Sequence, residues 1–251
     1  MTTNEQPVPA RNPFEPLERS PHKPVPGEPT EGFLSKATRA IYWYIVLTAL
    51  LVVACLPTIV LGMFLPPDPS NIPLIALTGL FVGPALSAGL YTVRARYTDL
   101  DLAPARAFWR GYRLNWADVL KLWVPAMVVL GIIGFTLAFG AEAGIGPMYR
   151  IALLVIAVVG LIWALHAVAI ATFFNFRTGD IARLAVYYMA FSVKSTFGVV
   201  AMAIVAIGIV AWASAALLGV VGGVWVWFWY QIDKPCFVDI WNRFTAKEPA
   251  E

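Results

Sequence analysis

Residues 151–174, IALLVIAVVGLIWALHAVAIATFF, contain no acidic side chain, no lysine and no arginine. A helix of about 20 apolar residues can cross the hydrocarbon core of a bilayer, since each residue adds about 1.5 Å to its length. Lipid offers no hydrogen-bonding partner, so a spanning backbone must satisfy its own polar groups, as a helix does. We therefore predict that this stretch is a membrane-spanning helix.

Three more runs meet the same criterion, over residues 40–64, 72–93 and 120–140. The whole chain has 251 residues, of which 59% are hydrophobic and only 13% are charged. An average soluble domain is about 45–50% apolar and about 25% charged. So few ionic groups could not cover the surface of a soluble protein of this size. The sequence predicts an all-α fold, a polytopic transmembrane helical bundle over residues 36–245.

The fifth apolar run, residues 197–230, is longer than one span but short for two spans and a turn. We predict a full fifth span over 197–219. A short sixth element over 222–244 is left open, because Asp233 and Lys234 would be costly in a lipid-exposed helix.

The two ends of the chain differ in composition from the bundle. Residues 1–35 are rich in proline, which removes backbone donors and fixes φ, so we predict a disordered cytoplasmic tail. No apolar segment follows a short basic start, so the first span should be an uncleaved anchor rather than a signal peptide. Residues 246–251 form a short C-terminal tail.

Lysine and arginine are concentrated in alternate connections between the predicted spans. The N-terminal tail, the connection from 94 to 119 and the connection from 175 to 196 are basic, whereas 65–71 and 141–150 together hold one base. Basic connections stay in the cytoplasm. We therefore predict a multi-pass protein of the bacterial plasma membrane with a cytoplasmic N-terminus, and leave the side of the C-terminus open.

The connection before the third span, residues 97–119, is both aromatic and basic. At about 100° a residue, the aromatic side chains fall in one arc of a helix and the arginines in a roughly opposite arc. Rings favour the headgroup level and arginines favour lipid phosphates. We predict an amphipathic helix lying flat on the cytoplasmic face; the alternative is a docking surface for a partner. The candidate contact residues are Arg106, Phe108, Trp109, Arg110, Tyr112, Arg113 and Trp116.

Residues 178–194 resemble this segment, since they combine the basic residues Arg183 and Lys194 with Tyr187, Tyr188 and Phe191. Thr178 is a candidate N-cap, and Asp180 would favour the positive end of the helix dipole. We predict a second interfacial helix. It either anchors the neighbouring span or forms a platform together with the first.

His166 and Pro84 are the candidate functional residues inside the membrane. An ionisable residue within a span is a functional candidate by default. A proton or ion path normally needs a second titratable group at similar depth, and the sequence indicates none, which favours a structural histidine. Pro84 would kink the second span, and broken helices bind substrate in many transporters. A kink that only shapes packing is the alternative.

Small residues recur at every fourth position in two spans, a spacing that lets helix backbones approach closely in lipid. Either these stripes pack within the bundle or the second span mediates self-association. The residues are Gly79, Gly83 and Ser87 in the second span and Ala211, Ala215 and Gly219 in the fifth.

The usual nucleotide-binding, metalloprotease and nucleophile-elbow motifs are absent from the sequence. The two cysteines, Cys55 and Cys236, have no metal-ligand spacing. We therefore predict a non-enzymatic protein with no catalytic residue, metal ligand, cofactor or nucleic-acid partner.

Residues 80–116, LFVGPALSAGLYTVRARYTDLDLAPARAFWRGYRLNW, resemble the YesL family of bacterial membrane proteins. Residues 173–198, FFNFRTGDIARLAVYYMAFSVKSTFG, are also similar to that family. The resemblance is carried by Gly83, Pro84 and Ala85, by Arg94 and Arg96, and by Phe108, Trp109, Arg110, Tyr112, Asn115 and Trp116.

The family has no established activity. The resemblance implies an accessory component of carbohydrate uptake or sensing, with the lipid bilayer and ABC-transporter components as candidate partners. The residues themselves leave a second hypothesis open, a small transporter or permease subunit with a substrate path near Pro84 and His166.

Overall fold

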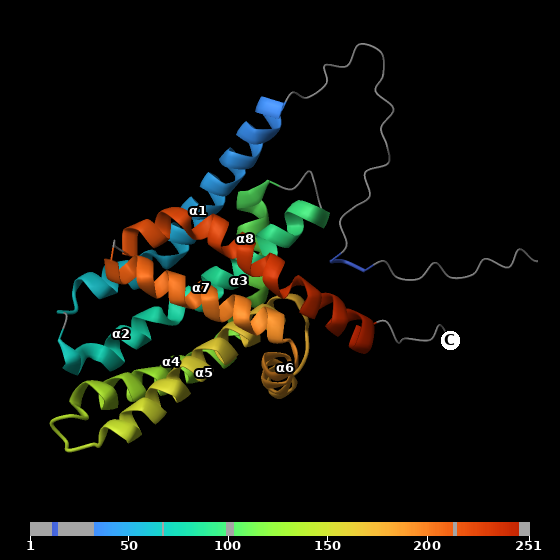
Figure 1. The fold of residues 1–251 in the computed structure, drawn as a ribbon. Coiled ribbons are helices and arrows are strands. Elements are labelled where there is room, and N and C mark those ends of the chain that lie inside the picture. The colour runs from blue at the N-terminus through green and yellow to red at the C-terminus, as the bar shows by residue number, and fades with distance from the viewer. Residues whose placement is uncertain (1–11, 15–32, 67, 99–102, 213–214, 246–251) are drawn as a thin grey trace, which may run out of the picture.

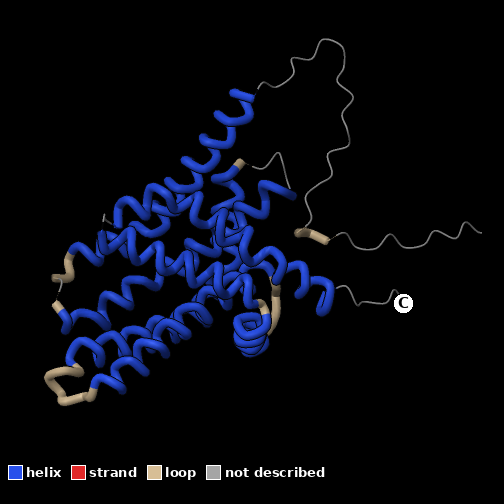
Figure 2. Tube along the Cα trace, viewed as in Figure 1, coloured by secondary structure: helices blue, strands red, loops and turns tan. Residues whose placement is uncertain are grey.

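The computed structural model describes residues 12–14, 33–66, 68–98, 103–212 and 215–245. Their regular structure is entirely helical. Figure 2 shows helices joined by short loops, with no strand in these ranges. The prediction of an all-α helical bundle is confirmed.

The first predicted span corresponds to α1, Phe33–Met63, and the second is divided between α2, Ile72–Thr78, and α3, Val82–Thr98. A 3₁₀ turn, Pro69–Asn71, precedes α2. A second 3₁₀ turn, Gly79–Phe81, joins α2 to α3. Together these elements make one apolar unit of 30 residues, long enough to cross a membrane.

The break between α2 and α3 has a local cause in Pro84. Proline has no N–H for the carbonyl four residues earlier, so the helix is distorted there. Side chains donate to carbonyls just before the break. Trp123 Nε1 donates to the carbonyl oxygen of Gly79 at 2.9 Å, and Thr58 Oγ1 donates to that of Thr78 at 2.7 Å. Pro84 is itself buried, near the start of α3.

Two long helices, α4 over Pro104–Phe139 and α5 over Pro147–Phe173, form an antiparallel hairpin (Figure 1). Each begins with a proline, whose missing N–H costs no helical hydrogen bond in the first turn. Gly144, in the connecting turn, has a φ of 71°, which glycine adopts without steric cost.

α4 differs from the prediction, because the aromatic and basic segment is not a separate helix lying flat. It forms the first turns of α4, which continues without a break into the third span. The physical reason is a shared buried face. Phe108, Asn115, Val119 and Leu122 are all buried, so the same side of the helix packs on the bundle before and after the expected boundary.

The second predicted interfacial helix is confirmed as a separate element, α6, Thr178–Phe191. It meets α7, Val193–Trp212, at an angle of 95°. Asp180 lies in its first turn as expected, but Arg177 rather than Thr178 is the N-cap residue, without a side-chain capping bond.

The long C-terminal apolar run forms two helices. α7 ends at Trp212, and α8 runs over Ala215–Ile240 before a single π-helical turn, Trp241–Thr245. The two helices run side by side in opposite directions (Figure 1). A fifth span reaching residue 219 is therefore wrong, and the element left open over 222–244 is a long helix that begins earlier. It packs on α1, α3 and α7, contacts that a short interfacial segment could not make.

Four helical units are long and apolar enough to cross a membrane: Ala37–Met63, Pro69–Thr98, Pro104–Phe139 and Pro147–Phe173. A fifth is present if the bent pair of α6 and α7 is counted as one span. This chain is therefore a polytopic membrane protein.

The small-residue stripe in the second span makes contacts within the bundle, and self-association through this span stays a prediction. A Cβ atom on Gly83 would lie 2.6 Å from Trp123 Cγ, and one on Gly79 would lie 3.5 Å from the Met127 sulfur, both on α4. Ser87 is buried against α5.

The fifth-span stripe does not exist as one helical face. Ala211 belongs to α7, whereas Ala215 and Gly219 belong to α8. The side chains of Ala211 and Ala215 lie outside the described part of the chain. Gly219 packs on α1, where an added Cβ would lie 3.7 Å from Val52.

A short part of the predicted disordered tail is ordered. Asn12–Phe14 is described, and Phe14 is only 2% exposed within the core. The tail prediction is wrong for these three residues, and also for residues 33–35, which begin α1. The other predicted tail residues, and residues 246–251, lie outside the described ranges.

Candidate functional site

The candidate site is a buried pair of titratable side chains, His166 on α5 and Asp233 on α8. His166 Nδ1 lies 3.7 Å from Asp233 Oδ2, and the two side chains are 3% and 1% exposed. Trp229, one helical turn before Asp233, donates its indole Nε1 to Asp233 Oδ2 at 2.8 Å. The fold thus supplies the second titratable group that the sequence analysis did not find.

Each member of the pair keeps one polar atom without a partner. Asp233 Oδ1 and His166 Nε2 are buried and make no hydrogen bond among the described residues. Buried polar atoms are nearly always paired, because an unpaired one forfeits its hydration. The pair therefore has unused capacity to hold a proton or a polar ligand.

Asp233 faces the interior because of its position in α8. The residues Val226, Tyr230, Asp233, Phe237 and Ile240 recur at alternating spacings of four and three, and all are buried. This is the spacing of one helical face. Treating Asp233 as a sign of lipid exposure was therefore wrong. The same periodicity, applied to the sequence, would have placed it on the apolar inner face.

A second polar cluster lies farther along α5 and holds three helices together. The Thr172 hydroxyl lies 2.8 Å from the Ser87 hydroxyl of α3 and 2.7 Å from the Val168 carbonyl oxygen. Asn115 Nδ2 on α4 donates to the Thr172 carbonyl oxygen at 3.2 Å. All of these side chains find partners, so this cluster is structural and contrasts with the His166–Asp233 pair.

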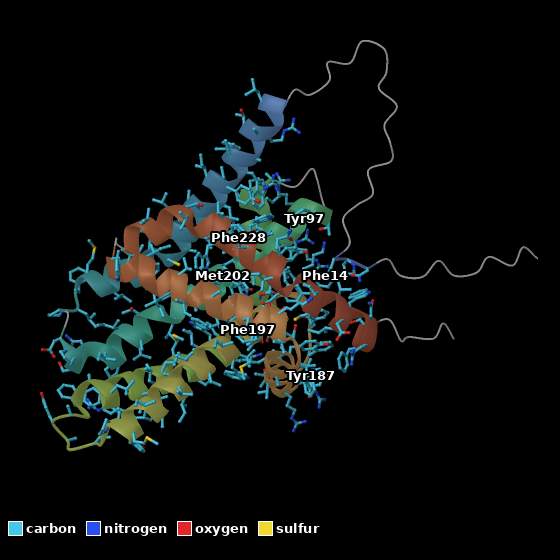
Figure 3. The ribbon with its side chains drawn as sticks, in the orientation of Figure 1. Phe14, Tyr97, Tyr187, Phe197, Met202 and Phe228 are labelled. Atoms are coloured by element: carbon cyan, nitrogen blue, oxygen red, sulfur yellow. The ribbon has the colours of Figure 1, made fainter. Side chains whose placement is uncertain are left out.

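An apolar groove of about 170 Å³ opens beside the buried pair. Leu165, next to His166, and Trp229, which donates to Asp233, both line it. The far wall comes from α7 and includes Met202, labelled in Figure 3. Trp229 therefore belongs both to the wall of this groove and to the hydrogen-bonded surroundings of Asp233.

The predicted contact residues of α4 fall into two groups. Arg106, Arg110 and Arg113 are exposed, and so are Trp109 and Trp116. These five residues, here called the α4 basic face, present cations and indoles together. Phe108 is instead fully buried in the core, and Tyr112 is half-buried against it.

A further charged cluster, not found by the sequence analysis, joins α6 to the end of α8. Tyr188 donates its hydroxyl to Asp239 Oδ2 at 2.7 Å, and Arg243 Nε donates to Asp239 Oδ1 at 2.9 Å. The hydrogen bond and charge of Asp239 raise the pKa of the exposed Arg243. Because its members are paired, this cluster clamps two elements and is a weaker candidate for a binding site.

Comparison with known protein families, with curated proteins and with solved structures finds no match. The resemblance to the YesL family therefore stays a prediction. In the described residues, no third histidine, cysteine or acidic side chain joins the His166–Asp233 pair to make a metal site.

Proposed function

We propose that this chain is a small, non-enzymatic transporter or permease subunit whose transport step depends on protonation of the His166–Asp233 pair. The supporting observation is that both groups are buried between two helices while each retains an unpaired polar atom. Intramembrane ionisable residues are costly and rare, and they mark substrate or ion pathways, proton relays, voltage sensors or counter-ions of ligands.

Protonation would change the charge state of the pair in a defined way. A proton on the unpaired Asp233 Oδ1 makes the carboxyl group neutral and leaves the bond from Trp229 to Oδ2 in place. If the proton instead binds His166, so that Nδ1 and Nε2 both carry hydrogen, the pair is an imidazolium facing a carboxylate at 3.7 Å. Because Leu165 and Trp229 also line the adjacent groove, the two states would offer a solute different surroundings.

Proton flux into liposomes tests this proposal. Purified protein is reconstituted with an internal pH-sensitive dye, and acidification is followed under an imposed inward proton gradient, with and without candidate sugars. We expect Asp233→Asn and His166→Ala to abolish the protein-dependent flux. The matched control is Asp239→Asn, the same change on the same helix but at a 39% exposed side chain paired with Arg243.

A proton flux in Asp233→Asn equal to that of the wild type would refute the proposal. It would also be refuted if the wild-type protein caused no proton flux with any of the gradients and solutes tested. Pro84→Ala is a further useful variant. Because Pro84 is buried and carries no titratable group, we expect Pro84→Ala to alter flux less than Asp233→Asn does.

A second proposed function is an accessory role in carbohydrate uptake or sensing at the bacterial plasma membrane, with the N-terminus in the cytoplasm. The α4 basic face favours it, because three arginines and two tryptophans are exposed together at one end of a spanning helix. Such a face fits anionic headgroups or an acidic surface of an ABC-transporter component. A second copy of this chain remains a candidate partner as well.

Affinity purification tests the accessory role. Changing Arg106, Arg110 and Arg113 to Glu should release bound transporter components while leaving the protein in the membrane. Partners retained by this variant would contradict the role. A reporter fused after the C-terminal residue, compared with one inserted in the 141–146 connection, establishes the orientation.

A further inference from the structure

Phe14 is separated from the first helix by residues 15–32, yet it is one of the most buried side chains of the protein, at 2% exposure. Figure 3 labels Phe14 beside the helical bundle, where its ring joins the core. A single phenylalanine from outside the bundle thus fills a space between helices.

The pocket around Phe14, here called the Phe14 pocket, is built by Arg94, Phe173, Phe174 and Phe237. The ring centroids of Phe173 and Phe237 each lie 5.5 Å from that of Phe14, and the Phe173 ring is edge-on at 84°. Phe174 lies 5.7 Å away. These are the separations at which aromatic rings attract one another beyond simple burial.

Arg94 makes the pocket selective for an aromatic ring. Its guanidinium carbon lies 4.8 Å from the centroid of Phe14 and 5.4 Å from that of Phe173. Among the described residues no carboxylate pairs with it, and its guanidinium lies over these two ring faces. A cation over a ring face contributes attraction that an aliphatic side chain of equal size cannot supply.

The backbone before Phe14 is shaped to present its ring. The Phe14 N–H donates to Asn12 Oδ1 at 3.0 Å, across Pro13, which forms a compact Asx turn. Asparagine accepts the bond and proline restricts φ, so the turn is partly organised before it docks.

We infer that the Phe14 pocket is a recognition site for the phenylalanine of an Asn-Pro-Phe turn, and that the chain's own Asn12–Phe14 segment is its ligand. The pocket joins α3, the end of α5 and α8, with Phe237 one turn beyond Asp233. Filling it braces the two helices that carry the buried pair. The inference stands on these contacts and does not depend on the proposed transport.

Peptide binding tests this site directly. The probe is a fluorescent peptide of residues 8–20, VPARNPFEPLERS, added to the full-length chain in nanodiscs. A tethered segment competes at an effective concentration on the order of 1 mM. The peptide should therefore bind Phe14→Ala at least about tenfold more tightly than it binds the wild type.

One change in the peptide and one in the protein distinguish recognition of the phenylalanine ring from nonspecific hydrophobic binding. Leucine in place of phenylalanine in the peptide should weaken binding to the Phe14→Ala protein about tenfold, since the ring and cation contacts are lost. The double variant Phe14→Ala with Phe237→Ala should bind neither peptide. Equal binding to wild type and Phe14→Ala, or no binding to Phe14→Ala, would overturn the inference.

A second measurement on the same proteins reports docking within one chain. Trypsin should cut after Arg11 severalfold faster in Phe14→Ala than in the wild type, because the docked turn begins at the next residue. A Phe14→Tyr protein, which keeps a ring, should be cut more slowly than Phe14→Ala. Identical cleavage rates in all three proteins would also overturn the inference.

Discussion

The Trp123 ring of α4 occupies the space that any side chain on Gly83 of α3 would require. An added Cβ would lie 2.6 Å from Trp123 Cγ, a separation that real Cβ atoms do not show. The same indole donates Nε1 to the Gly79 carbonyl oxygen at 2.9 Å. One tryptophan therefore sets the distance between α3 and α4 and also supplies a donor near the break before Pro84.

This relationship predicts that Gly83→Ala destabilises the protein. The rigid indole cannot retreat without losing its hydrogen bond, and overpacking of this kind costs about 1–3 kcal/mol. The measurement is the midpoint of denaturation of the purified protein in detergent. Gly160→Ala on α5 is the control, because an added Cβ there meets nothing within 4 Å. Equal midpoints for the two variants would show that the α3–α4 contact is looser than described.

A close approach of α1 and α8 gives a second prediction. The Gly223 N–H donates to Thr48 Oγ1 at 3.0 Å, and a Cβ on Gly223 would lie 2.8 Å from the Tyr44 carbonyl oxygen. Backbone cannot move aside as a side-chain tip can, so Gly223→Ala should lower the free energy of unfolding by about 1–3 kcal/mol.

The neighbouring glycine supplies the comparison for that variant. A Cβ on Gly222 would lie 3.6 Å from Leu51, an ordinary contact, so Gly222→Ala should leave the denaturation midpoint nearly unchanged or raise it slightly. A larger loss in Gly222→Ala than in Gly223→Ala would be incompatible with the described helix packing.

The third prediction separates stability from function at Asp233. Asparagine keeps an acceptor for the Trp229 indole but removes a buried charge that lacks a full set of partners. A buried carboxylate without a full set of partners costs free energy that a neutral amide does not, so Asp233→Asn should unfold at the same denaturant concentration as the wild type or a higher one. The measurement is the midpoint of denaturation in a buffer whose pH is high enough for the Asp233 carboxyl group to be ionised. A loss of more than about 2 kcal/mol would mean that the carboxylate is chiefly structural.

Much of the architecture could be predicted from local sequence. The runs that become the spanning parts of α1, α4 and α5 reach the length of a span and hold only one charged side chain between them, Lys121. Backbone hydrogen bonding in lipid leaves a helix as the outcome. The α6 segment was also predictable, because its basic and aromatic residues repeat with helical spacing.

Other features depended on contacts between distant residues. Residues 104–119 of the flat helix expected over 97–119 are part of α4, since Phe108 finds a buried position on the same face as Val119. Likewise, a long last helix was not predicted, because a charge at Asp233 would be costly in contact with lipid. In the structure α8 places Asp233 in the protein interior instead.

The sequence by itself determined that this chain is a helical membrane protein, because hydrophobic length and backbone hydrogen bonding are properties of each segment alone. Only the tertiary structure decided that His166 meets Asp233 and that Phe14 enters a pocket of three rings and Arg94. Those contacts join residues that are far apart in the chain. They form only when the helices pack together, so no local sequence pattern indicates them.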